Sequence, residues 1–323
     1  MKIVYTLLMF LFVVWLLLFT YLRNPVIAFS GNVNTLVKEE VLKAHVIALS
    51  SITPSRSFDQ PQSMYTAKQY ITDSLNKMGY KIRLQEVYSE DNIYHNIIAR
   101  YGDENATEVI VVGAHYDTAS KDNPGADDNA SGVAALLEIA NLFAQNKNPT
   151  KVPIEFVAYT LEEPPSFGGK GMGSAYHAEE LARNKVTVKF MMSLEMIGYY
   201  SNDWFSQDYP FSFFYLLYPW TGNFIALVSV PADRGLIQDF KKAMIPELNT
   251  TVYSVNAPAT LPGIDFSDHR SYWAFDWPAL MITDTAYLRN KNYHTPQDTA
   301  DRLDYKKMSD VVGGIYKALV NLN

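Results

Sequence analysis

The stretch that decides the fold is EVIVVGAHYD, residues 108–117. Its first six residues form a short, continuous apolar run that ends in glycine, which is typical of a strand buried on both faces of a sheet. Similar apolar runs recur at residues 154–159, 186–193, 224–229 and 278–282. These runs predict a central sheet that is covered on both sides.

Stretches with a helical spacing of apolar residues separate or flank these runs. They occupy residues 34–49, 63–78, 131–145, 173–183, 234–243 and 306–322. Residues 81–87 and 96–101 predict two further strands. Because strands alternate with helices, we expect an α/β fold, with a mainly parallel, mixed central sheet and helices on both faces.

The N-terminus has a different composition. Residues 3–22 form an apolar run flanked by Lys2 and Arg23, and roughly 20 residues are enough to cross a bilayer as a helix. We predict a transmembrane anchor at residues 1–23 and one folded domain at residues 24–323, outside the cytoplasm. The alternative is a signal peptide that is cleaved near residues 28–30, which would release a secreted protein.

The composition excludes several kinds of partner and site. The formal net charge of -7 gives no basic surface for nucleic acid, so we expect no nucleic-acid partner. The chain has no cysteine, which excludes disulfides and thiolate ligands. Any metal ion must therefore be held by histidines and carboxylates.

Polar side chains follow the first buried strand and precede the next helix. His115 ends the strand, and Asp117 is placed to accept a hydrogen bond from the imidazole ring. Asp127 and Asp128 then come just before the helix at 131–145, where a carboxylate can also serve as a helix cap. Capping accounts for one of these two aspartates and not for both.

Three later strands end in the same way. The pair Glu162–Glu163 follows residues 154–159, Glu195 ends the next apolar run, and His294 comes after the strand at 278–282. The carboxyl ends of parallel strands meet at one edge of a sheet. Two histidines and three carboxylates suit a pair of Zn²⁺ ions with one bridging carboxylate, while another carboxylate stays free as a general base.

The remaining histidines show weaker patterns. His45, His95 and His177 have no surrounding pattern of ligands, and we expect them to be structural. His269 follows Asp268 in the motif SDHRSYW, which fits either a place in a substrate site or a packing role.

Taken in order, these motifs resemble the zinc aminopeptidase family, which also includes glutamate carboxypeptidases and glutaminyl cyclases. The resemblance covers residues 34–323. It is carried by H-x-D at 115–117, D-x-x-S-G at 128–132, the glutamate pair at 162–163, E-M-I-G at 195–198 and H-T-x-x-D-T at 294–299. Glu195 stands where many members of the family have aspartate.

The resemblance implies a ligand set. His115 and Glu195 would hold one zinc ion, Glu163 and His294 would hold the other, and Asp128 would bridge the two. The fold implied is a three-layer zinc-exopeptidase sandwich, and the activity implied is hydrolysis of peptides at the amino terminus.

It also implies roles beside the metal ions. Glu162 would be the general base, and Tyr293 would stabilise the oxyanion. Asp117 would orient His115, and Asp268 and His269 would line the substrate site.

Two segments depart from the family pattern. The connection PPSFGGKGM, residues 164–172, is longer than in simple aminopeptidases, as it is in glutaminyl cyclases. It leaves open a cyclase that uses one zinc ion, and a third hypothesis is a catalytically silent ectodomain of the same fold. Residues 199–219 are rich in aromatic side chains, which fits self-packing, a cover over a substrate cleft, or contact with a membrane surface.

Overall fold

The computed structural model describes residues 2–29, 36–89, 92–147 and 149–323. The helices within these ranges are α1 (Lys2–Arg23), α2 (Glu39–Ser50), α3 (Pro61–Lys77), α4 (Gly132–Asn146), α5 (Gly173–Arg183), α6 (Arg234–Met244), α7 (Arg270–Trp273) and α8 (Tyr305–Leu322). The strands are β1 (Ile82–Tyr88), β2 (Ile93–Tyr101), β3 (Glu108–His115), β4 (Ile154–Tyr159), β5 (Thr187–Glu195), β6 (Phe224–Ser229), β7 (Thr251–Asn256) and β8 (Ala279–Thr283).

These strands form one sheet in the order β1-β2-β4-β3-β5-β8-β6-β7. The four central strands, β4, β3, β5 and β8, are parallel to one another. On either side of them, β2 and β6 run in the opposite direction. This arrangement confirms the expected mainly parallel, mixed sheet, and it gathers the residues that follow the four central strands at one edge.

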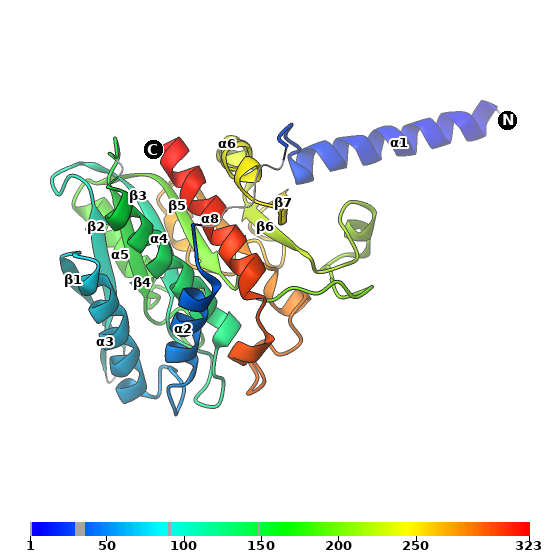
Figure 1. Cartoon of the computed structure of the whole chain (residues 1–323). Coiled ribbons are helices and arrows are strands. Elements are labelled where there is room, and N and C mark those ends of the chain that lie inside the picture. The colour runs from blue at the N-terminus through cyan, green and yellow to red at the C-terminus, as the bar shows by residue number, and fades with distance from the viewer. Residues whose placement is uncertain (1, 30–35, 90–91, 148) are drawn as a thin grey trace.

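The central strands are buried on both faces because neighbouring side chains pack into different cores. In β3, Ile110 and Val112 pack on the face covered by α2, α3, α4, α6 and α8, whereas Val109 and Val111 face α5 and α7. All four side chains are fully buried. Figure 1 shows the first of these helix layers in front of the sheet. The continuous apolar run in the sequence is explained by this double coverage.

At the β6–β7 end of the sheet, aromatic side chains cover the second face. We call residues 199–219 the aromatic segment. Its Phe214 and Tyr218 pack with Phe224 and Ala226 of β6, and Leu22 at the end of α1 joins the same cluster. α1 itself extends away from the rest of the molecule (Figure 1).

Three elements differ from the sequence expectations, and one of them is the one-turn helix α7, which was not expected. The strand β7 has no counterpart among these expectations, because its buried positions are Val252, Ser254 and Asn256, and only the first of these is apolar. The first expected helix, 34–49, begins at Glu39 in the structure, and its residues 34 and 35 lie outside the described residues.

Candidate metal centre and adjoining pocket

His115 is placed by the end of β3. The strand needs glycine at position 113, because a Cβ there would lie 2.1 Å from the ring of Tyr159 on β4. The imidazole is buried, and its Nδ1 lies 3.4 Å from Asp117 Oδ1. Asp117 also accepts hydrogen bonds from the backbone amides of Glu162 and Glu163, at 3.1 and 3.0 Å. One carboxylate therefore fixes the ends of β3 and β4 relative to each other.

The turn before α4 carries Asp127 and Asp128. Both backbone amides donate to the carboxylate of Asp298, each at 3.0 Å. The side chain of Asp127 accepts hydrogen bonds from Gly198 N and Asn290 Nδ2, at 3.0 and 2.9 Å, and so ties two loops together. Asp128 alone is left to face the histidines.

Glu195 is the last residue of β5 and is buried. Its Oε2 lies 3.4 Å from His115 Nε2 and accepts a hydrogen bond from Ser267 Oγ at 2.7 Å. The hydroxyl of Ser267 is in turn 2.7 Å from that of Ser193. The serine pair therefore fixes the carboxylate at the strand end through Oε2, the oxygen that faces His115.

His294 approaches from the loop after β8 with a left-handed backbone, at a φ of 58°. Its Nε2 lies 3.0 Å from Asp128 Oδ2 and 3.1 Å from Glu163 Oε1. Its side chain is 30% exposed, against 1% for His115. His294 is therefore at the rim of the cluster and His115 at its base.

Two groups of ligand atoms converge and share Asp128: the first is His115, Asp128 and Glu195, and the second is Asp128, Glu163 and His294. Asp128 Oδ2, Glu163 Oε1 and His294 Nε2 are buried and close together, but no hydrogen bond of acceptable geometry joins them to one another or to any other described residue. Buried polar atoms in native proteins are almost always paired. Converging lone pairs from imidazole and carboxylate are what a borderline divalent cation requires, so these residues fit two metal ions.

The electrostatics of the cluster support the same conclusion. Burial, reinforced by the charge of Asp128, raises the pKa of Glu163 to about 8 despite the nearby His294. Burial alone would lower the pKa of His294, but its contacts with Asp128 and Glu163 outweigh that effect and raise the pKa to about 10. Without metal, the cluster would retain protons at neutral pH, and divalent cations can replace them.

Glu162 lies beside these two groups and belongs to neither. Its carboxylate is buried, and Oε2 is 3.9 Å from His115 Nε2. Burial, with repulsion from Glu195 and Glu163, raises the pKa of Glu162 well above its usual range, although His115 acts in the opposite direction. A carboxyl group with an elevated pKa next to the cluster can take up a proton and release it again.

Tyr293 stands against the imidazole of His294, with ring centroids 3.7 Å apart and an interplanar angle of 19°. Its other ring neighbour is Tyr287, at 5.9 Å. Burial raises the pKa of the phenol, so the hydroxyl stays a hydrogen-bond donor over the accessible pH range.

Asp268 and His269 lie deeper in the molecule. Asp268 is fully buried, and burial raises its pKa to about 7. His269 Nε2 donates to the carbonyl of Ile264 at 2.8 Å, and its ring packs edge-on against Trp273 at 4.6 Å. Neither residue supplies an atom to the two converging groups.

The other three histidines also lie apart from the two groups. His45 Nδ1 lies 2.7 Å from the hydroxyl of Tyr70, and His177 lies between Glu155 and Tyr272. His95 is at the start of β2.

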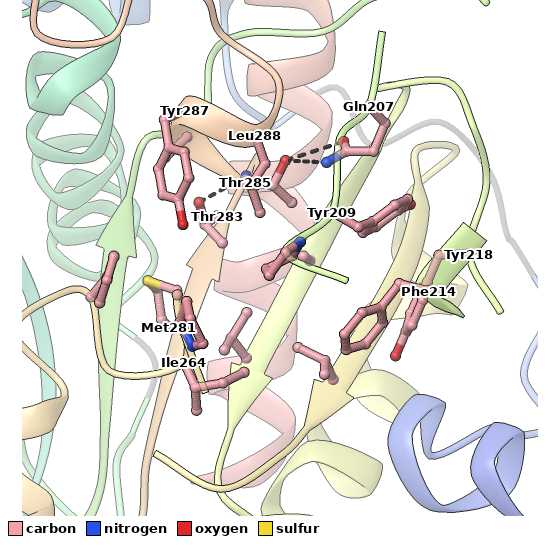
Figure 2. Close-up of a pocket in the computed structure, with 18 of the residues that line it drawn as sticks. Gln207, Tyr209, Phe214, Tyr218, Ile264, Met281, Thr283, Thr285, Tyr287 and Leu288 are labelled. Carbon is pink, nitrogen blue, oxygen red and sulfur yellow. Dashed lines mark hydrogen bonds between the residues drawn. The ribbon is translucent and has the colours of Figure 1, made fainter. Parts of the chain in front are cut away.

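An apolar pocket opens directly beside the cluster, with Glu195 and Tyr293 among its lining residues. Figure 2 shows Phe214 and Tyr218 on one side of this space and Met281 and Ile264 on another. The residues of β6 that line it are Phe224, Ala226 and Val228. The aromatic segment therefore both packs its own rings, as Phe213 on Phe214 at 4.4 Å shows, and forms a wall of the pocket.

This pocket and the roles of Asp298, Ser267 and Asn129 were not predicted from the sequence. Asn129 accepts from the amides of Gly132 and Met196 and donates to Leu194 O, which joins the turn before α4 to β5. The sequence did contain a signal for the role of Asn129, because it is a polar residue in a glycine-containing turn beside the candidate ligands.

Residues 96–318 match the model of peptidase family M28. The chain belongs to this family. The chain is similar to the uncharacterized protein YfbL of Escherichia coli, to which it is 43% identical over 95% of this chain and 97% of that one. It is also similar to leucine aminopeptidase 1 of Aspergillus fumigatus, to which it is 29% identical over 66% of this chain. The chain spans about half the length of that aminopeptidase, 52%.

Solved structures share the fold at lower identity. LapB from Legionella pneumophila has a TM-score of 0.70 at 23% identity, covering 88% of this chain and 72% of that one. Porphyromonas gingivalis glutaminyl cyclase has a TM-score of 0.63 at 19% identity, covering 90% of this chain and 100% of that one. The M28 protein therefore belongs to a peptidase family, and its fold is also found in a glutaminyl cyclase.

Proposed function

We propose that this M28 protein is a membrane-anchored aminopeptidase that uses two zinc ions to release apolar residues from the amino terminus of peptides. The observation that carries the proposal is the pair of ligand groups sharing Asp128, with Glu162 beside them and the apolar pocket opening next to them.

The first ion would be held by His115, Asp128 and Glu195, and the second by Asp128, Glu163 and His294. Mixed imidazole and carboxylate ligands favour zinc over magnesium or calcium. Two such ions supply Lewis acidity that polarises the scissile carbonyl and lowers the pKa of water.

Glu162 is proposed as the general base. Its carboxylate is near His115 but outside both ligand groups, so it is free to accept a proton from the attacking water. The same carboxyl group then donates that proton to the nitrogen of the leaving amine. Tyr293 lines the pocket next to His294, where its hydroxyl can donate a hydrogen bond to the carbonyl oxygen as negative charge develops.

The pocket would accept the side chain of the amino-terminal residue. Ala226, Val228, Ile264 and Met281 contribute aliphatic surface, and aromatic rings complete the walls. Burial of an apolar side chain there contributes roughly 1.5–3 kcal/mol of binding. Leucine, phenylalanine and methionine are the expected residues.

The second candidate is a glutaminyl cyclase, which the long connection at 164–172 and the likeness to the Porphyromonas gingivalis enzyme favour. A cyclase must bind the polar carboxamide of glutamine. The apolar lining of the pocket offers little to such a group, because an amide that loses water without gaining hydrogen bonds is bound weakly. The aminopeptidase is therefore preferred.

The test is product analysis with the full chain in detergent and added zinc. One peptide begins with leucine, and a second, otherwise identical peptide begins with glutamine. Release of free leucine, with a shortened peptide remaining, is the expected result. Loss of ammonia from the glutamine peptide without release of an amino acid from either would replace the proposal with the cyclase.

A further inference from the structure

The chain just after α1 is bound into the folded domain. Asn24 is fully buried, donates to the carbonyl of Arg234 at 2.9 Å and accepts from Gln238 Nε2 at 2.7 Å. The ammonium group of Lys241, on α6, donates to the carbonyls of Arg23 and Asn24, both at 3.1 Å. The end of α1 is therefore held by side chains of α6 that are far away in the sequence.

Lys241 makes removal of this segment costly. Lys241 is only 5% exposed, and among the described residues the one other partner of its ammonium group is Ser254 Oγ at 3.2 Å. Cleavage of the chain near residues 28–30, followed by loss of the released part, would take away two of these three acceptors. A buried charge left without partners destabilises a fold by several kcal/mol. The domain thus depends on residues that a signal peptidase would remove.

The last turns of α1 also pack against the aromatic segment. Trp15 Nε1 donates to the carbonyl of Leu216 at 3.0 Å, and Arg23 donates to that of Leu217 at 2.8 Å. The guanidinium of Arg23 lies over the ring of Tyr253 on β7, at 4.5 Å. In Figure 1 the aromatic segment, in green, projects beyond the sheet on the same side as α1.

Around this contact, large apolar side chains are exposed to solvent. They are Trp204 at 76%, Phe205 at 66%, Phe211 at 41%, Phe213 at 42%, Leu216 at 72% and Trp220 at 41%. Four of these six lie within residues 209–232, which carry no charged side chain, whereas Asp203 and Asp208 flank Trp204 and Phe205. We call these six side chains the exposed aromatic patch. Tryptophan and other aromatic side chains are favoured at the boundary between lipid and water.

The length of α1 brings the patch to the same boundary. Residues 3–14 precede the first contact with the aromatic segment at Trp15, and they cover only about 18 Å of helix axis. The hydrocarbon core of a bilayer is about 30 Å thick. If the apolar run that follows Lys2 begins the crossing, about 12 Å of the core remains at Trp15, so Trp15 and the side chains packed beside it meet the membrane on the side of the folded domain.

We propose that α1 is retained in the mature protein and that the exposed aromatic patch enters the lipid–water interface beside it. The occupant of the patch is a lipid bilayer, and the domain is held on the membrane in one orientation. The proposal rests on α1 as a membrane helix, and it does not depend on the reaction catalysed.

Retention is tested by mass spectrometry of the full chain, purified from membranes through a C-terminal tag. The expected product contains the peptide that precedes Asn24. A mature chain that begins at Pro25 or later would overturn the proposal.

Insertion of the patch is tested by spin labelling, since the chain has no cysteine of its own. Single variants Phe213→Cys and Leu216→Cys are labelled in the full chain, in vesicles of phosphatidylethanolamine and phosphatidylglycerol. Tyr65→Cys on α3 and Leu84→Cys on β1 are matched controls, because they replace exposed apolar residues, 49% and 43%, and β1 forms the opposite edge of the sheet from β7.

For each label, the measured quantity is the ratio of its collision rate with dissolved oxygen to its collision rate with a water-soluble nickel complex. This ratio is expected to be several-fold higher for labels on the patch than for the control labels. Equal ratios at all four positions would show that the patch lies in water and would overturn the proposal. Shielding of positions 213 and 216 from both reagents would show that a protein, such as a second copy of the chain, covers the patch, and this result would also overturn the proposal.

Discussion

The two regions on either side of Glu195 and Tyr293 are built by different forces. On one side, the candidate metal ligands are fixed by directed hydrogen bonds, such as those from two backbone amides to Asp117 and from two more to Asp298. On the other side, the pocket is formed by packed rings and aliphatic side chains. The hydrogen bonds of the first region can form in only a few arrangements of its side chains, whereas the apolar packing of the second region is compatible with many.

This difference predicts different responses to substitution. Changes in the polar region should abolish chemistry or weaken metal binding, because catalytic groups must stay within about 0.5 Å of their working positions. Changes in the pocket should alter which substrate is preferred and leave the chemistry intact.

The largest effect is expected from Glu162→Gln. The amide cannot accept the proton of the attacking water, so kcat should fall by about 10²- to 10⁴-fold while zinc stays bound. The measurement is steady-state kinetics with zinc analysis of the same sample. Glu138→Gln is the control, because Glu138 is a buried glutamate of α4 that contacts Asn141, away from the cluster. Equal activity in the two variants would remove Glu162 from the mechanism.

Asp298→Asn is expected to act through Asp128. Only one oxygen would remain to accept the amides of Asp127 and Asp128, so the turn that presents Asp128 should loosen. Zinc affinity should fall by about 10- to 100-fold, as is typical for residues that orient ligands. Competition with a chelator measures this change.

The matched control for this variant is Asp310→Asn. Asp310 likewise accepts backbone amides, from Asn249 and Thr250, but it lies on α8 away from the cluster. Similar zinc affinities in the two variants would refute a specific positioning role for Asp298.

In the pocket, Ala226→Leu should fill space used by the substrate side chain. The ratio of kcat/KM for leucyl over alanyl peptides is expected to fall by about tenfold, the effect of a few methylene groups in a hydrophobic pocket. Turnover of the alanyl peptide is the internal control and should be preserved. An equal loss on both substrates would indicate damage to the cluster and not to the pocket.

The smallest effect concerns His269, which supports the pocket through the carbonyl of Ile264. Burial lowers its pKa to about 4, from 6.5 in the unfolded chain, so the unfolded state binds the proton first as the pH falls. Stability is therefore complete above pH 6.5 and decreases toward pH 4. Between pH 6.5 and 5.5 the loss is about 1 kcal/mol.

Urea unfolding of the metal-free chain in detergent measures this dependence. The variant His269→Gln should lose stability overall but show a shallower change with pH over the same interval. An unchanged slope would mean that His269 does not titrate in this way.

The same contrast explains how much could be predicted from the sequence. Buried strands such as residues 108–113 and the polar residues that follow them stand out, because charge at the end of an apolar run is unusual. The choice between Asp127 and Asp128 needed the family resemblance, since the contacts of Asp127 with Gly198 and Asn290 join residues that are distant in sequence.

The pocket could not be predicted in this way. Ala226, Val228 and Met281 belong to strands that read as ordinary core, and nothing local marks which face meets a cavity. The aromatic segment showed an unusual composition, but its place beside α1 and β7 depends on long-range packing. Residues that act through their chemistry are visible in a sequence, whereas those that act through shape emerge only in the fold.

The central claim is that Asp128 joins two metal sites. The most direct measurement is the zinc content of the full chain after equilibration with excess zinc and removal of the free ion. We expect two zinc ions per chain, and one in His294→Ala, which removes a ligand from the second group alone. A single ion in the unaltered chain, unchanged in His294→Ala, would contradict it.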